Sequence, residues 1–192
     1  MTPPPAAVRV LSGGAAKGLI GAARPAFAEC CGAGIEGTFG AVGAMKEKLL
    51  SGEPCDVAIL TAALVDELTA SGLLVPGSGA PLGRVRTGIA VRAADAPPDI
   101  ADRASLAAAL RNAKAIYFPD PQRATAGIHF VNVLRRLGIE AAVAPFLKPF
   151  ADGATAMQQL AQAREAHAIG CTQLTEILYT DGVALAGPLP AE

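Results

Sequence analysis

The chain has 192 residues, of which 52% are hydrophobic and 17% charged, and its formal net charge at pH 7 is -1. This is enough apolar material for one or two domains with a core. Nucleic acid is excluded as a partner because its binding needs a basic surface, and here acids balance the Lys and Arg residues. No apolar run reaches the roughly 20 residues of a spanning helix, so direct membrane insertion is not expected.

The first seventy residues predict three strand–helix units. The expected strands are 8–12, 35–39 and 56–60, and the expected helices are 15–31, 42–50 and 62–71. Three such units in succession predict a parallel sheet with helices on both faces.

A segment rich in Gly and Pro, 74–83, precedes a second series of elements. The expected strands are 84–92, 115–118, 142–147, 167–171 and 183–187, and the expected helices are 105–112, 126–137, 153–163 and 174–179. We predict two α/β lobes, 1–82 and 83–183, with 184–192 as a return crossover towards the first lobe. Ligands of such sheets bind beyond the carboxyl ends of the strands, so the predicted site is a cleft between the lobes.

In the first lobe, short polar or small residues follow each strand. Ser12 and Gly13 follow the first strand, Gly40 and Ala41 the second, and Thr61 the third. A strand, a small-residue turn and a helix start expose backbone amides that bind anions. The glycine spacing matches neither the phosphate loop nor the dinucleotide motif. We therefore predict a small-anion site, with helix capping as the alternative role of Ser12 and Thr61.

The second lobe offers six ligand-binding candidates at its strand ends: Arg123, Thr125, Ala126, Gly127, Asp152 and Gln173. Ala126 and Gly127 leave the first amides of a helix open. Arg123 is either a counter-ion for a carboxylate, able to form a bidentate pair, or an exposed loop charge.

Two residues are candidate catalytic groups. Glu176 is either a catalytic carboxylate or a first-turn residue that favours the helix dipole. His129 is either an acid or base, or a packing residue within its helix.

No metal site and no cofactor are expected. The two histidines have no partners at ligand spacing, and the four cysteines form no CxxC pair, so they are interpreted as small buried hydrophobic residues. The amino-terminal residues lack a basic region followed by a long apolar run. The sequence as it stands therefore predicts a cytoplasmic protein, and a periplasmic one if a leader has been removed.

Five stretches, taken in order, resemble one family: SGGAAKGL, TFGAVGAMKEKLLSGEPCDVAIL, LGRVRTGIAVR, YFPDPQRATAGIHF and IGCTQLTEIL followed by VALAGPLPAE. Their order and spacing are similar to substrate-binding proteins of the molybdate-binding type. This resemblance implies the type II periplasmic-binding-protein fold, two α/β lobes around an anion cleft, and places Ser12, Ala126 and Gly127 at ligand-binding positions.

The chain departs from the molybdate binders at two strand ends. Gly40, Ala41 and Val42 stand where those proteins place a serine, and Cys171, Thr172 and Gln173 stand near their tyrosine. The sequence therefore resembles a divergent branch, which includes solute binders and isomerases of small tricarboxylates such as aconitate. Family members also continue beyond GPLPAE, so either the chain is shortened or its first lobe lacks the closing helices.

Two functions are consistent with these features. One is binding of a small oxyanion or organic carboxylate in transport or sensing; the other is an isomerase acting on a di- or tricarboxylate. The expected partners are the small anion and either an ABC permease or a second copy of the chain, because a first lobe without closing helices exposes apolar surface.

Overall fold

The computed structural model describes residues 7–190. The chain divides into two compact units, Met1–Arg84 and Val85–Glu192, which are treated one at a time below. The α/β architecture predicted from the sequence, with a parallel and a mixed sheet, is confirmed.

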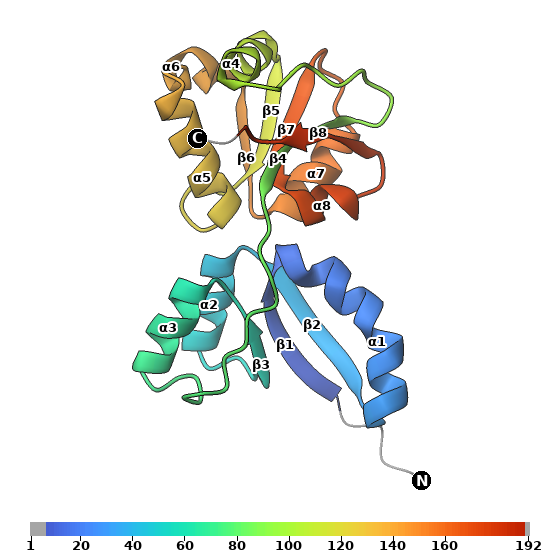
Figure 1. The fold of residues 1–192 in the computed structure, drawn as a ribbon, viewed down its shortest axis with the longest axis vertical. Coiled ribbons are helices and arrows are strands. Elements are labelled where there is room, and N and C mark those ends of the chain that lie inside the picture. The colour runs from blue at the N-terminus through green and yellow to red at the C-terminus, as the bar shows by residue number, and fades with distance from the viewer. Residues whose placement is uncertain (1–6, 191–192) are drawn as a thin grey trace. The chain divides into compact units, whose positions relative to one another are not determined.

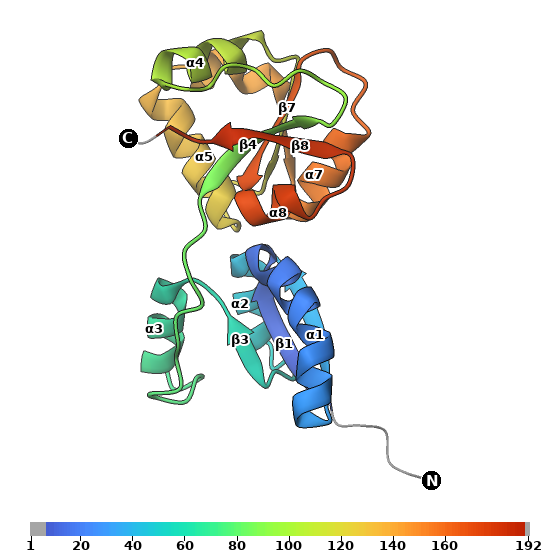
Figure 2. The same cartoon turned by 45° about the vertical axis from the view of Figure 1, so that its right-hand side comes forward.

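The first unit is built on a three-stranded parallel sheet in the order β2-β1-β3. Its elements are β1 (Ala7–Gly13), the 3₁₀ turn η1 (Gly14–Ala16), α1 (Lys17–Cys31), β2 (Gly34–Gly40), α2 (Val42–Leu50), β3 (Val57–Ile59) and α3 (Ala62–Ala70). Figures 1 and 2 both show α1 on one side of this sheet and α2 and α3 on the other. Gly32 ends α1 with φ +63°, in the left-handed region that glycine adopts without strain.

The second unit contains a five-stranded mixed sheet in the order β6-β5-β7-β4-β8. Its elements are β4 (Thr87–Arg92), α4 (Arg103–Asn112), β5 (Ala115–Pro119), α5 (Thr125–Arg136), α6 (Glu140–Val143), η2 (Ala144–Phe146), β6 (Leu147–Phe150), α7 (Gly153–Ala161), β7 (Ala168–Gln173), α8 (Leu174–Leu178) and β8 (Val183–Pro188). Strands β5, β6 and β7 are parallel, and β4 is antiparallel to both β7 and β8. Residues 183–188, where the return crossover is expected to begin, are thus an edge strand of this sheet.

The second unit has an apolar core on each face of its sheet. On β5, Ile116 and Phe118 belong to the cluster that includes residues of α4 and α5, whereas Ala115 and Tyr117 belong to the cluster that includes residues of α7. This division follows from the strand geometry, because successive side chains point to opposite faces. Phe118 and Phe130 pack with ring centroids 5.4 Å apart, which joins β5 to α5.

The predicted strand at 142–147 is wrong. Residues 140–143 form α6, residues 144–146 form η2, and the strand β6 begins only at Leu147. Short apolar runs do not distinguish strand from helix by periodicity alone. Pro149 lies within β6 and lacks the N–H of a ladder bond, which is tolerated because β6 is at the sheet edge.

The first unit is less completely packed than the second. Every residue of α1 is exposed or half-buried, and both apolar core clusters among the described residues lie in the second unit. Six large apolar side chains of the first unit are exposed: Leu19, Leu50, Val57, Leu73, Val75 and Leu82. Where such side chains form a contiguous patch, they mark a face that another molecule or segment covers.

Cysteine burial differs from the expectation. Cys171 is fully buried on β7, but Cys30 and Cys31 are exposed at the end of α1 and Cys55 is half-buried. Cys30 and Cys31 are the last two residues of α1, which buries none of its residues. Within residues 7–190, no helix combines the length and apolar character needed to span a bilayer.

Candidate functional site

In the first unit, the ends of β1 and β2 bring two helix starts together. The register pairs Gly13 with Gly40, so η1 and α2 begin next to one another at the carboxyl edge of the sheet. A Cβ added at Gly13 would lie 2.8 Å from Cγ1 of Val42, the first residue of α2. Gly13 therefore lets the two turns approach closely.

The three helix starts at this edge differ in how their amides are satisfied. Thr61 Oγ1 accepts a hydrogen bond from the amide of Leu64 at 3.4 Å and caps α3. By contrast, the capping positions of η1 and α2 are Gly13 and Ala41, whose side chains carry no oxygen. The start of α2 therefore has no side-chain cap, and its first amides are ones from which an external anion could accept hydrogen bonds.

Ser12 is fully buried, and its hydroxyl donates to the carbonyl of Gly13 at 2.9 Å. The alternative in which Ser12 caps the following helix is wrong. Strand β1 continues to Gly13, so Ser12 lies one residue before the capping position. Its role as a ligand residue stays a prediction.

In the second unit, the first turn of α5 packs against the carboxyl end of β5. A Cβ at Gly127 would collide with the backbone carbonyl oxygens of Pro119 and Asp120, so only glycine allows this approach. The capping residue is Ala124, which has no side-chain oxygen, and it is followed by Thr125, exposed, and Ala126, buried. The first turn of α5 thus presents backbone N–H groups of a 12-residue helix without a side-chain cap.

Helix α7 begins after β6, and the carboxyl groups of Asp152 and Glu176 lie at its start. The carboxylate of Asp152 accepts from the amide of Thr155 at 2.8 Å. Glu176 is 4% exposed and accepts a 2.5 Å hydrogen bond from the hydroxyl of Thr172. A Cβ at Gly153 would collide with both of those side chains, so the Glu176 carboxylate lies against the first residue of α7. Asp152 and Glu176 thus supply negative charge to this helix start.

The other predicted site residues have distinct environments. Arg123 is exposed, and its backbone amide donates to the carboxylate of Asp120 at 3.0 Å. His129 is half-buried on α5, one turn after Thr125. Gln173 ends β7, where it pairs with Thr87 of β4.

The structure places Tyr179 near the acidic pair at α7. Burial, together with the negative charges of Glu176 and Asp152, raises the pKa of Tyr179 well above its ordinary value. The phenol therefore stays protonated at neutral pH. The catalytic roles of Glu176 and His129 stay predictions.

The sequence interpretation named Thr172 at a strand end but missed the hydrogen bond that it donates to Glu176, because a spacing of four positions across a strand–helix junction has no distinctive pattern. It also missed three arginines, Arg86, Arg103 and Arg136, that line one pocket with Thr125 and His129. The spacing of four residues between Thr125 and His129 could have indicated that they share one face of α5. The sequence has no comparable signal that brings Arg103, on another helix, close to α5.

The sequence from residue 8 to residue 192 matches the family of bacterial extracellular solute-binding proteins. The chain belongs to this family. The resemblance noted in its strand-end motifs is thereby confirmed.

Three individual relatives illustrate the similarity of this solute-binding protein to known proteins. An aconitate isomerase from a Pseudomonas species is 26% identical over 196 residues, covering 97% of this chain and 71% of that protein. The periplasmic molybdate-binding protein of Azotobacter vinelandii superposes with a TM-score of 0.73 at 18% identity, covering 96% of this chain and 77% of the other. The sulfate-binding protein SubI of Mycobacterium tuberculosis H37Rv gives a TM-score of 0.70 at 17% identity, covering 95% and 71%. At these identities the solved structures establish the shared fold.

The close approach of α5 to β5 leaves no room for a side chain at Gly127 of this solute-binding protein. We expect Gly127→Ala to destabilise the second unit by about 1–3 kcal/mol, the usual range for overpacking. Unfolding in urea, followed by tyrosine fluorescence, measures this directly because both tyrosines, Tyr117 and Tyr179, lie in the second unit.

Gly21→Ala on α1 is the matched control, since a Cβ there meets nothing within 4 Å. It should leave the helix unchanged or stabilise it by up to about 1 kcal/mol, measured by far-UV circular dichroism. A Gly127→Ala protein as stable as the parent would contradict the packing of α5 on the Pro119 and Asp120 carbonyls.

Proposed function

We propose that the protein binds a small anion, an oxyanion or an organic carboxylate, through backbone amides at helix starts of both units. The donors in the first unit are the amides that begin α2, after Ala41. The donors in the second unit are those of Thr125, Ala126 and Gly127.

The contrast between capped and uncapped helix starts carries the proposal. At the carboxyl edges of the strands, α3 and α7 are capped by the side chains of Thr61 and Asp152, whereas the capping positions of η1, α2 and α5 hold only Gly or Ala. Helix starts leave amides that need acceptors. The helix dipole favours an anion as that acceptor, and no charged side chain is required.

The named relatives support an anionic ligand. The two solved proteins compared above are described as binding molybdate and sulfate, and the isomerase acts on aconitate, by their names. Tetrahedral oxyanions and carboxylates share the oxygen acceptors that backbone amides recognise. The residues of this chain therefore favour a small anion as the ligand, without selecting one particular oxyanion or carboxylate.

Ligand identity is testable by thermal unfolding in the presence of molybdate, tungstate, sulfate, citrate and aconitate. A ligand present at 100 times its dissociation constant should stabilise the folded protein by about 2.7 kcal/mol, because it binds only the folded state. The expected result is a rise in melting temperature with at least one of these anions. No shift with any of them, at concentrations up to 10 mM or so, would contradict the proposal.

Two variants at Thr125 distinguish the contribution of its backbone amide to anion binding from that of its side chain. Thr125→Pro removes the backbone N–H at the first helical position, where proline is well tolerated, and Ala124 already has the extended conformation that precedes proline (φ -105°, ψ 128°). It should weaken anion binding by about 1.5–3 kcal/mol, the value of a hydrogen bond to a charged group.

Thr125→Ala keeps the amide and is the matched control, so its affinity should remain near that of the parent. Calorimetric titration with the anion that gives the largest thermal shift measures both. Equal affinities for the proline and alanine variants would argue that the α5 amides do not bind the ligand.

The aconitate isomerase relative favours a second candidate function, isomerisation of a small di- or tricarboxylate. In such a reaction a base removes a proton from carbon, the negative charge spreads onto the adjoining carboxylate, and a proton returns to a different carbon. Amides at the start of α5 and Arg123 would stabilise that charge. Glu176 and His129 are the candidate bases.

Proton exchange distinguishes this enzyme from a simple binder. With aconitate in D₂O, an isomerase should replace a carbon-bound proton by deuterium, seen as loss of the corresponding proton NMR signal. Glu176→Gln or His129→Gln should abolish the exchange, depending on which residue is the base. An acid that binds and shows no exchange over many hours would contradict the isomerase function and leave the binding function intact.

We further propose that the protein works with a protein partner, an ABC permease or a second copy of the chain. The exposed apolar side chains of the first unit support this. A periplasmic location would fit the permease, and a cytoplasmic one would fit a sensor or an isomerase.

A further inference from the structure

Two exposed thiols occupy adjacent positions at the end of α1. Cys30 and Cys31 are the last two residues of this helix, and neither takes part in a disulfide. Gly32 follows them with φ +63°, and its amide donates to the carbonyl oxygen of Ala28 at 3.0 Å. This hydrogen bond ends the helix in a defined conformation, so the backbone that carries the two thiols has a fixed geometry.

The covalent chain keeps the sulfur atoms of these two residues, called the thiol pair below, within reach of each other. The Cα atoms of adjacent residues lie about 3.8 Å apart across a trans peptide bond. Ordinary disulfides join Cα atoms about 4.4–6.8 Å apart, so the thiol pair is poorly placed to form a disulfide of its own. An ion between the sulfurs lengthens the bridge, because two metal–sulfur bonds of about 2.3 Å span roughly 4.6 Å.

The number of available ligands restricts the ions that the thiol pair can hold. Among residues 7–190, no group of three or more His, Cys, Asp or Glu side chains could hold a metal ion. Structural zinc takes four protein ligands, so the thiol pair does not suit zinc. Thiolates select soft ions, and a soft ion that accepts two sulfurs in a linear arrangement needs no third ligand.

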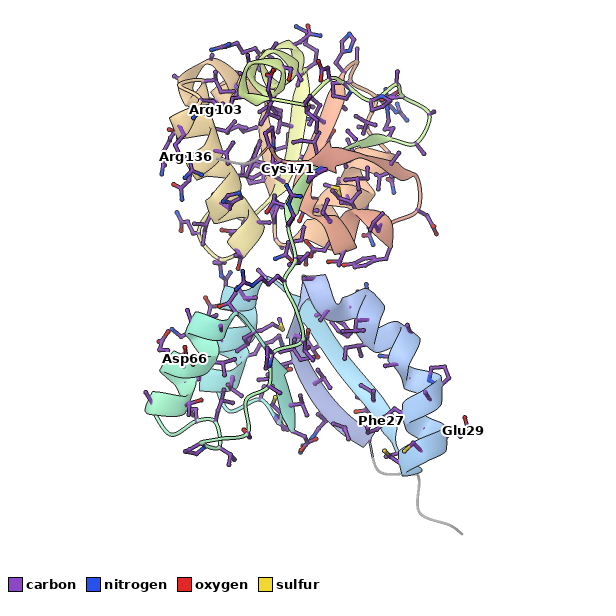
Figure 3. The ribbon with its side chains drawn as sticks, viewed as in Figure 1. Phe27, Glu29, Asp66, Arg103, Arg136 and Cys171 are labelled. Atoms are coloured by element: carbon purple, nitrogen blue, oxygen red, sulfur yellow. The ribbon has the colours of Figure 1, made fainter. Side chains whose placement is uncertain are left out.

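The surroundings of the thiol pair favour a complex without net charge. The last turn of α1 contains no basic residue, and Glu29, immediately before the pair, is exposed. Figure 3 shows Phe27 and Glu29 on this part of the helix. The negative end of the helix dipole lies here as well. Two thiolates give a singly negative complex with a monovalent ion and a neutral complex with a divalent one, so a divalent ion is favoured.

We propose that Cys30 and Cys31 form a two-coordinate site for a soft divalent cation, of which Hg(II) is the representative. Each thiol releases its proton to solvent, and its sulfur donates an electron pair to the ion. One Hg(II) ion and two thiols therefore give a neutral bis-thiolate and two protons, and neither the ion nor the sulfurs change oxidation state. Because protons compete with the ion for the sulfurs, the apparent affinity should fall as the pH falls.

The thiol pair lies at the opposite end of β2 from the proposed anion donors of the first unit. Strand β2 begins at Gly34, shortly after Cys31, and ends at Gly40, immediately before the capping residue of α2. Its seven residues span about 20 Å at roughly 3.3 Å per residue. An ion at the thiol pair therefore does not contact the amides after Ala41, and this proposal goes beyond the proposed function without depending on it.

Titration of the reduced protein with mercuric chloride, in the presence of excess 2-mercaptoethanol, tests the site. The monothiol removes an ion that a single cysteine holds, whereas two sulfurs on one chain hold the ion more tightly by about 10²–10⁴-fold. Native mass spectrometry should show one Hg(II) ion per chain. The ultraviolet absorption of the mercury–thiolate bonds should rise to an end point at one equivalent.

The cysteines of the first unit provide matched variants. Cys30→Ser and Cys31→Ser should each weaken Hg(II) binding at least about a hundredfold, because the remaining thiol has no second sulfur beside it. Cys55→Ser removes the half-buried thiol of the same unit and should change the affinity less than about twofold, since Cys55 is outside the chelate. Far-UV circular dichroism checks that all three variants remain folded.

Parent-like Hg(II) affinity in Cys30→Ser or Cys31→Ser, loss of binding in Cys55→Ser, or one ion shared between two chains would overturn the proposal. Anion-induced thermal shifts that are unchanged in Cys30→Ser and Cys31→Ser would confirm that the two sites are separate. A protein that none of the anions stabilises, and that still binds Hg(II) in this pattern, would refute the proposed function alone.

Discussion

The first turn of α5 lies against the carbonyl groups of Pro119 and Asp120, and this approach depends on the absence of a Cβ at Gly127. It brings three successive backbone amides to the carboxyl end of β5, next to β7 in the same sheet. A larger residue would lift the helix from the strand end and move the amides with it. The position of these amides is therefore a consequence of packing, since they are backbone groups that every residue but proline has.

The same principle explains why the remaining strand ends have different roles. Side-chain oxygens of Thr61 and Asp152 serve the starts of α3 and α7, and Glu176 adds a buried carboxylate beside Gly153. Each helix start favours negative charge or a hydrogen-bond acceptor, and these starts obtain it from the protein itself. The starts of α2 and α5, which have Ala at the capping position, have no such side-chain acceptor.

The two units differ in how completely they bury their apolar side chains. Both faces of the second sheet carry a buried apolar cluster, so α5 and its pocket are supported on a packed core. In the first unit α1 is exposed or half-buried throughout, and large side chains such as Leu50 and Val75 are 56% and 72% exposed. Burial of apolar area is the main source of folding free energy, so the first unit gains more from a covering partner than the second.

The amino-acid sequence by itself determined the features that depend on neighbours in the chain. Strand–turn–helix junctions at Gly13, Ala41 and Gly127 were predictable because glycine and alanine turns between apolar runs have local signatures, and the capping role of Thr61 was among the predicted alternatives. The segment at 142–147 was mispredicted because a short apolar run fits strand and helix equally, and its choice depends on packing.

Only the tertiary structure decided which distant groups meet. It brought Thr172 and Glu176 to Gly153, and Arg103 to the carbonyl of Arg136, across 33 positions of the chain. It also placed Ser12 one residue before the capping position, within the strand. These contacts depend on strand order and helix packing, which no short sequence window contains, because the energy that fixes them comes from burial spread over a whole unit.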